Sequence, residues 1–289
     1  MLAFENWTSR ICSSIVFLLI GLSGHASATE QKDQRVVTLS PHAVEMLYAI
    51  DAGHMIVGTT MFSDYPASAK EIPVVGGYSA INVEAIIALK PDLIVTWQSG
   101  NPDKQIKQLA QFGVNTYDSD PQILADVADD ILALGKLVGR EAQAARFAAT
   151  YLDKLTELRL QHQDATPVSV FYQLWPKPLR SVAQGSWIQQ TLAMCGADNI
   201  FATAPAHYPL VNLETIITAD PEVIFVTDET GQPEYAWWQQ WPNLRVVKSD
   251  QVFELNSSWL HRAGPRSLLG VEQVCQYLDE VRQRQQLKL

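Results

Sequence analysis

The chain has 289 residues, of which 47% are hydrophobic and 18% charged, enough apolar sequence for one or two globular domains with ample core. Asp and Glu number 31 against 21 Lys and Arg, which gives a formal net charge of −10 at pH 7. This acidity argues against nucleic acid and anionic membranes as partners.

The first 28 residues have the pattern of a secretory signal peptide. Arg10 supplies a positive charge, Ile11 to Leu22 form an apolar run too short to span a bilayer, and Ala26-Ser27-Ala28 is a small-residue cleavage site. No cysteine follows the run at a lipidation position. We therefore expect a soluble exported protein, cleaved near Ala28, and not a lipoprotein.

Alternating strands and helices follow. A short strand from Arg35 leads to Ser40-Pro41, which opens a helix that we expect to end at Gly53. Further apolar strands are expected from Ile56 and after Pro91, the second ending at Thr96-Trp97. Helices alternating with apolar strands at this spacing indicate a parallel α/β sheet, and such sheets bind ligands at the carboxyl ends of their strands.

A long helix is expected between residues 140 and 164, because apolar residues recur there every three or four positions without an intervening Gly or Pro. It would stiffly connect two α/β halves and limit their hinge motion. In the second half, a strand at Val168–Tyr172 and a helix from Ile188 to Cys195 repeat the earlier order. We predict an N-terminal lobe at 29–139, a connecting helix at 140–164 and a C-terminal lobe at 165–289.

One stretch occurs twice, about 130 residues apart, at 77–95 and 207–225. In each copy an Asn is a candidate helix N-cap, a Glu lies in the first helical turn, and a Pro ends the helix before a buried strand. The glutamates are Glu84 and Glu214. Helix dipoles favour a carboxylate there for purely local reasons, but one equivalent carboxylate in each half also predicts a paired function.

Two cysteines remain after the predicted signal peptide, which contains Cys12. Cys195 and Cys275 are an even pair in an exported chain and are most simply a structural disulfide. A metal-binding or nucleophilic role is disfavoured, because neither lies in a Cys-x-x-Cys pattern or near an obvious His partner.

Signatures of enzymes are missing from the sequence. It contains no G-x-S-x-G, no glycine-rich phosphate loop and no H-E-x-x-H. The histidines lack the spacing of metal ligands, so we expect each to be a surface or capping residue. We predict that the chain is not an enzyme and holds no metal or cofactor.

Aromatic residues instead mark the loops that leave the predicted strands, and we expect them to gather at one rim of two facing sheets. They are Tyr65, Tyr78, Trp97, Trp175, Tyr208 and Trp259. Such side chains suit a large, partly planar ligand that bears amides. Some of the aromatics in the chain are expected in the core, and the role of the cluster Trp237, Trp238 and Trp241, in a predicted loop, is left open.

Several segments between residues 35 and 280 resemble class III periplasmic substrate-binding proteins of ABC importers, and within that group its cobalamin-binding members. The segments are Thr38-Leu39-Ser40-Pro41, Ser63-Asp64-Tyr65-Pro66, Asn82-x-Glu84 with Leu89-Lys90-Pro91-Asp92-Leu93, Trp97-x-x-Gly100-Asn101, Cys195-Gly196-x-x-Asn199-Ile200-Phe201 and Ser258-Trp259-x-x-Arg262-Ala263-x-Pro265-Arg266. The resemblance implies an α/β fold of two Rossmann-like lobes, each with a central parallel sheet, joined by a single long helix.

The resemblance also implies a periplasmic carrier whose ligand is cobalamin or a related corrinoid. Tyr78 and Tyr208 stand where the cobalamin binders have tryptophans, Ser258 replaces an aspartate, and the loop from Leu174 to Gly185 carries an apparent two-residue insertion. The full set of ligand-binding residues expected is Tyr65, Tyr78, Trp97, Trp175, Tyr208, Ser258, Trp259 and Arg262.

The same resemblance implies a membrane partner. Glu84 and Glu214 would pair with arginines on the two permease subunits of an ABC importer in the inner membrane, and the free protein would be a monomer. Cys195 and Cys275 match the disulfide of the cobalamin binders.

Two other ligands stay open as alternatives within the group. Haem is the first, because haem binders of this class often ligate iron with a Tyr near the position of Tyr78, although usually one residue further from the glutamate and beside an Arg. A ferric siderophore is the second, with Arg180, Arg262 and Arg266 as candidate partners for an acidic chelator. An exported corrinoid-modifying enzyme would need a catalytic constellation that the sequence lacks.

Overall fold

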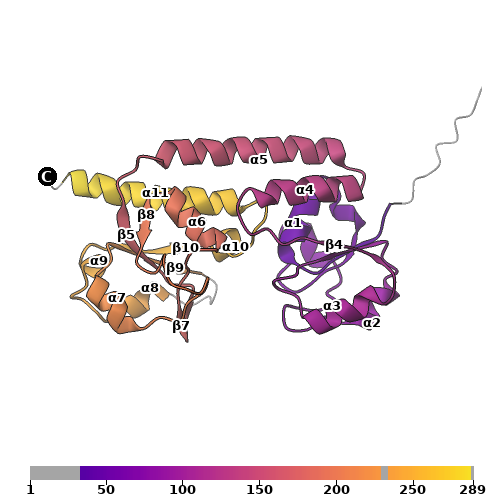
Figure 1. The fold of residues 1–289 in the computed structure, drawn as a ribbon, viewed down its shortest axis with the longest axis horizontal. Helices are drawn as coiled ribbons and strands as arrows, with labels where there is room; N and C mark the ends of the chain where they lie inside the picture. The colour runs from indigo at the N-terminus through magenta and orange to yellow at the C-terminus, as the bar shows by residue number, and fades with distance from the viewer. Residues whose placement is uncertain (1–32, 229–233, 288–289) are drawn as a thin grey trace, which may run out of the picture. The chain divides into compact units, whose positions relative to one another are not determined.

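The computed structural model describes residues 33–228 and 234–287, and the chain from Gln34 onward belongs to one compact unit (Figure 1). The predicted signal peptide at residues 1–28 lies outside the described residues. Within the described residues, no helix has the length and apolar character needed to cross a membrane.

The first sheet has four parallel strands in the order β2-β1-β3-β4. Its strands are β1 (Val36–Thr38), β2 (Ile56–Gly58), β3 (Leu93–Thr96) and β4 (Asn115–Asp118). The inner strands β1 and β3 are buried throughout, whereas the edge strand β4 is polar and mostly exposed. Continuous apolar runs are typical of parallel strands that helices cover on both faces.

The second sheet repeats this arrangement with the order β10-β9-β5-β8, again with parallel neighbours. Its strands are β5 (Val168–Tyr172), β8 (Ala197–Asn199), β9 (Val223–Thr227) and β10 (Val252–Leu255). A separate antiparallel hairpin, β6 (Trp175–Pro176) with β7 (Leu179–Arg180), follows β5. Two parallel sheets in one α/β chain confirm the predicted fold class.

A single helix of 22 residues, α5 (Glu141–His162), leads from the first sheet to the second and packs against α4 and α11 (Figure 1). Its buried face consists of Ala144, Ala148, Tyr151, Leu155 and Leu158. The Tyr151 hydroxyl lies 2.8 Å from the Ser267 hydroxyl at the start of α11, and burial raises its pKa to about 12. The predicted boundaries of the two lobes flank this helix and stay predictions.

The remaining helices connect the strands. Those before α5 are α1 (Pro41–Ala49), the 3₁₀ turns η1 (Gly53–Met55) and η2 (Ala67–Glu71), α2 (Val83–Ala88), α3 (Asp103–Ala110) and α4 (Asp126–Leu137). Those after α5 are α6 (Trp187–Met194), α7 (Leu213–Ala219), α8 (Glu234–Trp238), α9 (Arg245–Lys248), α10 (Ser257–Leu260) and α11 (Ser267–Gln286).

Two local expectations were wrong. Helix α1 ends at Ala49 and not at Gly53, because Asp51 takes a left-handed conformation (φ 60°) and the Ala52 N–H bonds to the Leu47 carbonyl. The predicted tryptophan loop instead contains α8. Trp238 on this helix is fully buried against Phe171, and its indole N–H donates to the Gln173 side chain at 3.0 Å. Trp238 is therefore a core residue.

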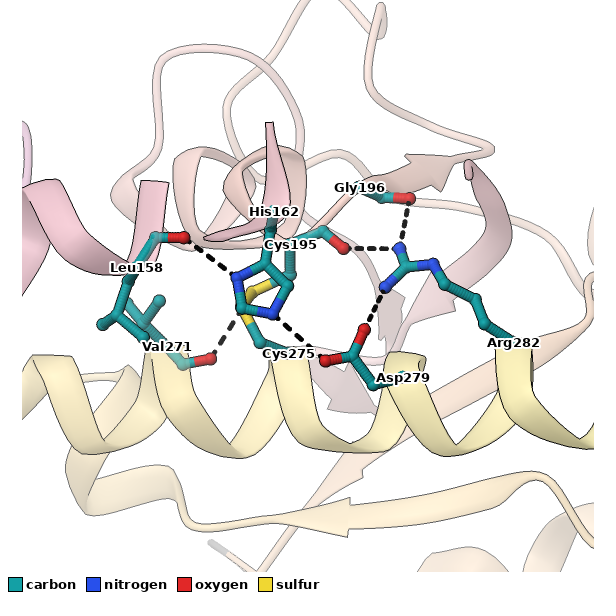
Figure 2. The surroundings of a disulfide bond; sticks show 8 residues. All are labelled: Leu158, His162, Cys195, Gly196, Val271, Cys275, Asp279 and Arg282. Carbon is teal, nitrogen blue, oxygen red and sulfur yellow. Dashed lines mark hydrogen bonds and ion pairs between the residues drawn. A yellow bond between two sulfur atoms is a disulfide. The ribbon is translucent and has the colours of Figure 1, made fainter. Parts of the chain in front are cut away.

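The predicted disulfide is confirmed. Cys195, at the end of α6, is bonded to Cys275 on α11 (Figure 2). Around it, Arg282 donates to the Cys195 carbonyl at 2.6 Å and to the Asp279 carboxylate at 2.7 Å. The His162 imidazole at the end of α5 lies 3.2 Å from the same carboxylate. The bond therefore joins the end of α6 to α11, and the His162–Asp279 contact attaches the end of α5 to the same region of α11.

Replacing both cysteines with alanine is expected to lower the free energy of unfolding by about 4 kcal/mol, because the bond closes a loop of 80 residues in the unfolded chain. Urea denaturation of the purified protein would measure this loss. Wild-type protein kept reduced should unfold at the same urea concentration as the variant. A difference below about 1 kcal/mol between oxidised wild type and variant would contradict the assignment.

Candidate functional site

Most of the predicted ligand-binding residues lie just beyond the carboxyl ends of strands. Tyr65 lies in the loop after β2, Trp97 directly follows β3, and Trp175 begins the hairpin after β5. Ser258 and Trp259 lie on α10, which follows β10. Because the strands of each sheet are parallel, these ends share one edge of their sheet, the usual place for a ligand in such folds.

Charged residues from two distant parts of the chain meet beside Tyr65. Arg262 donates to the Asp64 carboxylate at 2.7 Å and to the Glu45 carboxylate at 3.3 Å. Arg266 holds both oxygens of Glu45, at 2.9 and 2.6 Å, and its guanidinium stacks 4.0 Å from the centre of the Tyr65 ring. The structure thus brings the predicted residues Tyr65 and Arg262 into one network.

Glu45 is the member of this network that the sequence analysis missed. It lies on α1, and its side chain is only 2% exposed. The available signal was a lone Glu inside the apolar run Ala43-Val44-Glu45-Met46-Leu47, because a buried carboxylate needs a cationic partner.

Burial alone would raise the pKa of Asp64, but the bond and charge of Arg262 outweigh it and lower that pKa.

Trp97 is held by its own loop, which explains the Trp-x-x-Gly-Asn motif. The Trp97 backbone N–H donates to the Asn101 side chain at 2.8 Å, and the Asn101 amide in turn donates to the Leu39 carbonyl at 2.8 Å. Gly100 faces the indole so closely that any Cβ at this position would overlap the ring. The motif therefore fixes the orientation of the indole.

His42, expected to be a surface or capping residue, is buried under this loop, and that expectation was wrong. It is 3% exposed, its ring packs edge-on against Trp97 with 5.4 Å between centroids, and its Nε2 lies 3.0 Å from the Ser119 carbonyl. Burial lowers its pKa to about 4, against the smaller raising effects of that hydrogen bond and of the Asp120 charge. The imidazole supporting Trp97 is therefore neutral at pH 7.

His42 should make stability depend on pH. Its pKa falls from 6.5 to about 4 on folding, so the unfolded chain takes up the proton first as the pH drops. Between pH 6.5 and 4 the free energy of unfolding should fall by up to about 3 kcal/mol from this group. Denaturation of His42→Gln at pH 7, 5.5 and 4 should lack this part of the slope. The exposed His54→Gln should keep it, and an unchanged slope in His42→Gln would contradict the assignment.

Trp175, Arg180 and Tyr208 form a second group at the site. The Arg180 Nη1 donates to the Tyr208 carbonyl at 2.8 Å, and its guanidinium lies 6.0 Å from the centre of the Trp175 ring. Trp175 itself is 48% exposed. Burial, with a smaller contribution from the Asp120 carboxylate, raises the pKa of the Tyr208 hydroxyl. Asp120, which follows β4, also contributes a small raising effect to the pKa of His42.

Other predicted residues stand apart. Tyr78 is 71% exposed in the loop before α2, and Ser258 and Trp259 are half-buried on α10. In the described part of the chain, no side-chain hydrogen bond or ring contact joins these three to the other predicted residues.

The paired glutamates occupy equivalent positions. Glu84 and Glu214 are each the second residue of a helix, α2 and α7, and both are exposed. The Asn82 side chain caps α2 by accepting the Ala85 N–H at 2.9 Å, and Asn212 caps α7 in the same way. The internal repeat thus presents one carboxylate on each half of the chain.

A hollow of about 700 Å³ lies beside the end of β4 and is lined mainly by aspartates. Its lining includes Asp118, Asp120, Asp126, Asp129 and Asp130. Over residues 33–228 and 234–287, no group of three or more His, Cys, Asp or Glu side chains is arranged to hold a metal ion. This surface is unfavourable for acidic ligands.

These features define a class of protein. A family model described as periplasmic binding protein matches residues 36–258, and the chain belongs to this family. Membership places the chain among binding proteins, as predicted, and not among enzymes.

Curated relatives within this family are named for vitamin B12 binding. The chain is 38% identical over 245 residues to the vitamin B12-binding protein of Vibrio cholerae serotype O1. The aligned region covers 85% of this chain and 89% of the relative. It is 35% identical over 277 residues to the vitamin B12-binding protein of Vibrio parahaemolyticus, covering 96% and 99%. The predicted resemblance is confirmed.

Solved structures agree with these relatives. The crystal structure of the periplasmic vitamin B12 binding protein BtuF of Vibrio cholerae matches with a TM-score of 0.78 and 38% identity, over 86% of this chain and 98% of that one. The periplasmic heme-binding protein RhuT of Roseiflexus sp. RS-1 also matches with a TM-score of 0.78, over 86% and 99%. At 20% identity the second likeness concerns the fold alone.

Proposed function

We propose that this protein is a periplasmic carrier that binds cobalamin or a related corrinoid between its two lobes and delivers it to an ABC importer. The observation that carries the proposal is the 38% identity, over most of both chains, to proteins named for vitamin B12 binding. The aromatic residues beyond the strand ends support it, because they offer broad apolar faces to a large planar ligand.

In this proposal the ligand is bound by shape, stacking and hydrogen bonds, by the eight residues that the sequence analysis named. Tyr65, Trp97 and Trp175 supply aromatic faces, and Arg262 supplies hydrogen-bond donors. Ser258 and the exposed Tyr78 supply hydroxyls. No separate cofactor takes part.

The proposal includes export and docking. Residues 1–28 act as a signal peptide cleaved near Ala28, and the mature protein is monomeric when free. Exposed Glu84 and Glu214 meet arginines on the two subunits of the permease, because carboxylates and arginines pair strongly at interfaces. The lobes extend over residues 29–139 and 165–289.

Calorimetric titration of the purified mature protein tests the ligand. Cyanocobalamin should bind with one-to-one stoichiometry, and haemin in a parallel titration should cause no change in its absorbance spectrum. Trp97→Ala should weaken cobalamin binding, whereas Phe112→Ala, at an exposed aromatic beyond α3, should leave it unchanged. No heat with cobalamin and an iron–tyrosinate spectrum with haemin would overturn the corrinoid and favour haem with Tyr78 as ligand.

A further inference from the structure

Arg180, at the end of β7, has a donor that the fold does not satisfy. Its Nη1 bonds to the Tyr208 carbonyl at 2.8 Å, but its Nε is buried and has no hydrogen-bond partner among the described residues. A buried N–H without a partner costs roughly 1–3 kcal/mol, and such groups are rare in native structures. An anionic group bound at the exposed part of the guanidinium would offset this cost.

The charge of Arg180 is also unbalanced. Arg262 and Arg266 pair with Glu45 and Asp64, whereas within residues 33–228 and 234–287 no carboxylate forms an ion pair with Arg180. Its guanidinium contacts the Tyr208 carbonyl and lies over the Trp175 ring, and both of these groups are neutral. A half-buried guanidinium in this setting favours an anionic acceptor over a neutral one, because only the anion compensates its charge.

Arg180 lies beside residues of the proposed ligand site. The hairpin β6–β7 follows the carboxyl end of β5 and carries the half-exposed Trp175, while Tyr208 belongs to the same group at the site. The Arg180 backbone is fixed by the pairing of β6 with β7, and its side chain is fixed by the bond from Nη1 to the Tyr208 carbonyl. Arg180 therefore suits recognition of a fixed oxyanion.

We propose that Arg180 is a specificity residue that binds an oxyanion on the edge of the ligand. The inference rests on the proposed corrinoid function. A cobalamin is fringed with neutral amides and carries one anionic group, the phosphodiester of its nucleotide loop. Arg180 then distinguishes complete corrinoids from those that lack this phosphate.

Three corrinoids test the inference, each in the dicyano form so that the axial ligands match. They are cobalamin, cobinamide, which lacks the phosphate, ribose and base of the nucleotide loop, and cobinamide phosphate, which lacks only the ribose and base. Calorimetry with wild type should give at least tenfold tighter binding of cobalamin and cobinamide phosphate than of cobinamide. Arg180→Gln should reduce this difference to within about threefold by weakening the two phosphorylated ligands. Arg180→Lys, which keeps the charge, should retain part of it.

Lys177→Gln is the matched control, because Lys177 is an exposed cation on the same hairpin and should leave all three affinities unchanged. Far-UV circular dichroism and thermal melting of each variant confirm that the fold is intact. Equal losses for all three ligands in Arg180→Gln, or no loss, would overturn the inference and leave the corrinoid function standing. Failure of every corrinoid to bind wild type would overturn the proposed function and this inference with it.

Discussion

Exchanging Glu84 and Glu214 together for lysine is expected to abolish ligand uptake while leaving ligand affinity unchanged. Both carboxylates are exposed at the starts of α2 and α7, and within the described part of the chain neither forms a hydrogen bond or ion pair with a predicted ligand residue. Removing one partner of a charged pair at an interface typically costs about 2–5 kcal/mol. Taking about 2 kcal/mol for each site, the double reversal should weaken docking roughly 1,000-fold.

The fold should tolerate this change. A lysine in place of a glutamate in the first turn of a helix loses about 0.3–1 kcal/mol of favourable interaction with the helix dipole, well below the total stability of a typical domain. Glu141→Lys is the matched control, because Glu141 is likewise exposed in the first turn of a helix, α5, but lies outside the repeat. It should keep full uptake.

Uptake of labelled cobalamin by cells lacking the native carrier, together with calorimetry of each purified variant, provides the two measurements. Full uptake by the double variant would contradict the docking assignment. A loss of affinity as large as that of Trp97→Ala would instead place the glutamates at the ligand. Single reversals, each expected to cause part of the loss, would reveal whether both halves contribute equally.

Pattern alone was sufficient for much of the fold, for identifiable reasons. The inner strands of both sheets are mainly apolar, so their runs are visible in the sequence, and the long α5 keeps an apolar residue every three or four positions. The short helix α8 was not predictable in this way. Its five residues hold one buried tryptophan, and packing of Trp238 against Phe171 decides its conformation.

The residues of the candidate site also differ in whether the sequence alone could predict them. Aromatics after strand ends could be found because chain order places them at one edge of a parallel sheet. The pairing of Glu45 with Arg262 and Arg266 could not, because the partners lie 217 and 221 positions apart and meet only once both halves have folded. His42 was misjudged for a related reason, since segments distant in the sequence bury it, among them the loop of Trp97 and Ser119.

A large loss of stability is expected when Glu45 is replaced. Its side chain is 2% exposed and accepts bonds from Arg262 at 3.3 Å and from Arg266 at 2.9 and 2.6 Å. Glu45→Gln keeps the shape but leaves two largely buried cations with only Asp64 to balance them. Leaving a buried charge without its partner typically costs about 3–5 kcal/mol, and chemical denaturation should give a loss of this size. Asp64→Asn, at a half-exposed partner, should lose no more than about 1 kcal/mol.

Removing the partner cation as well should restore stability, although it deletes more hydrogen bonds. In Glu45→Met with Arg266→Met, the remaining charges are Arg262 and Asp64, which already pair at 2.7 Å, and no unbalanced cation stays buried. We expect this double variant to be at least about 2 kcal/mol more stable than Glu45→Gln, even after the loss of the Arg266 contact with Tyr65. If the loss of stability in the double variant equals the sum of the losses in Glu45→Met and Arg266→Met measured singly, charge balance is not the cause, and the effect is one of packing. Ligand affinity should depend on how firmly Arg262 is held, so it should fall in Glu45→Gln. In the double variant Asp64 still pairs with Arg262, and most of the affinity should return.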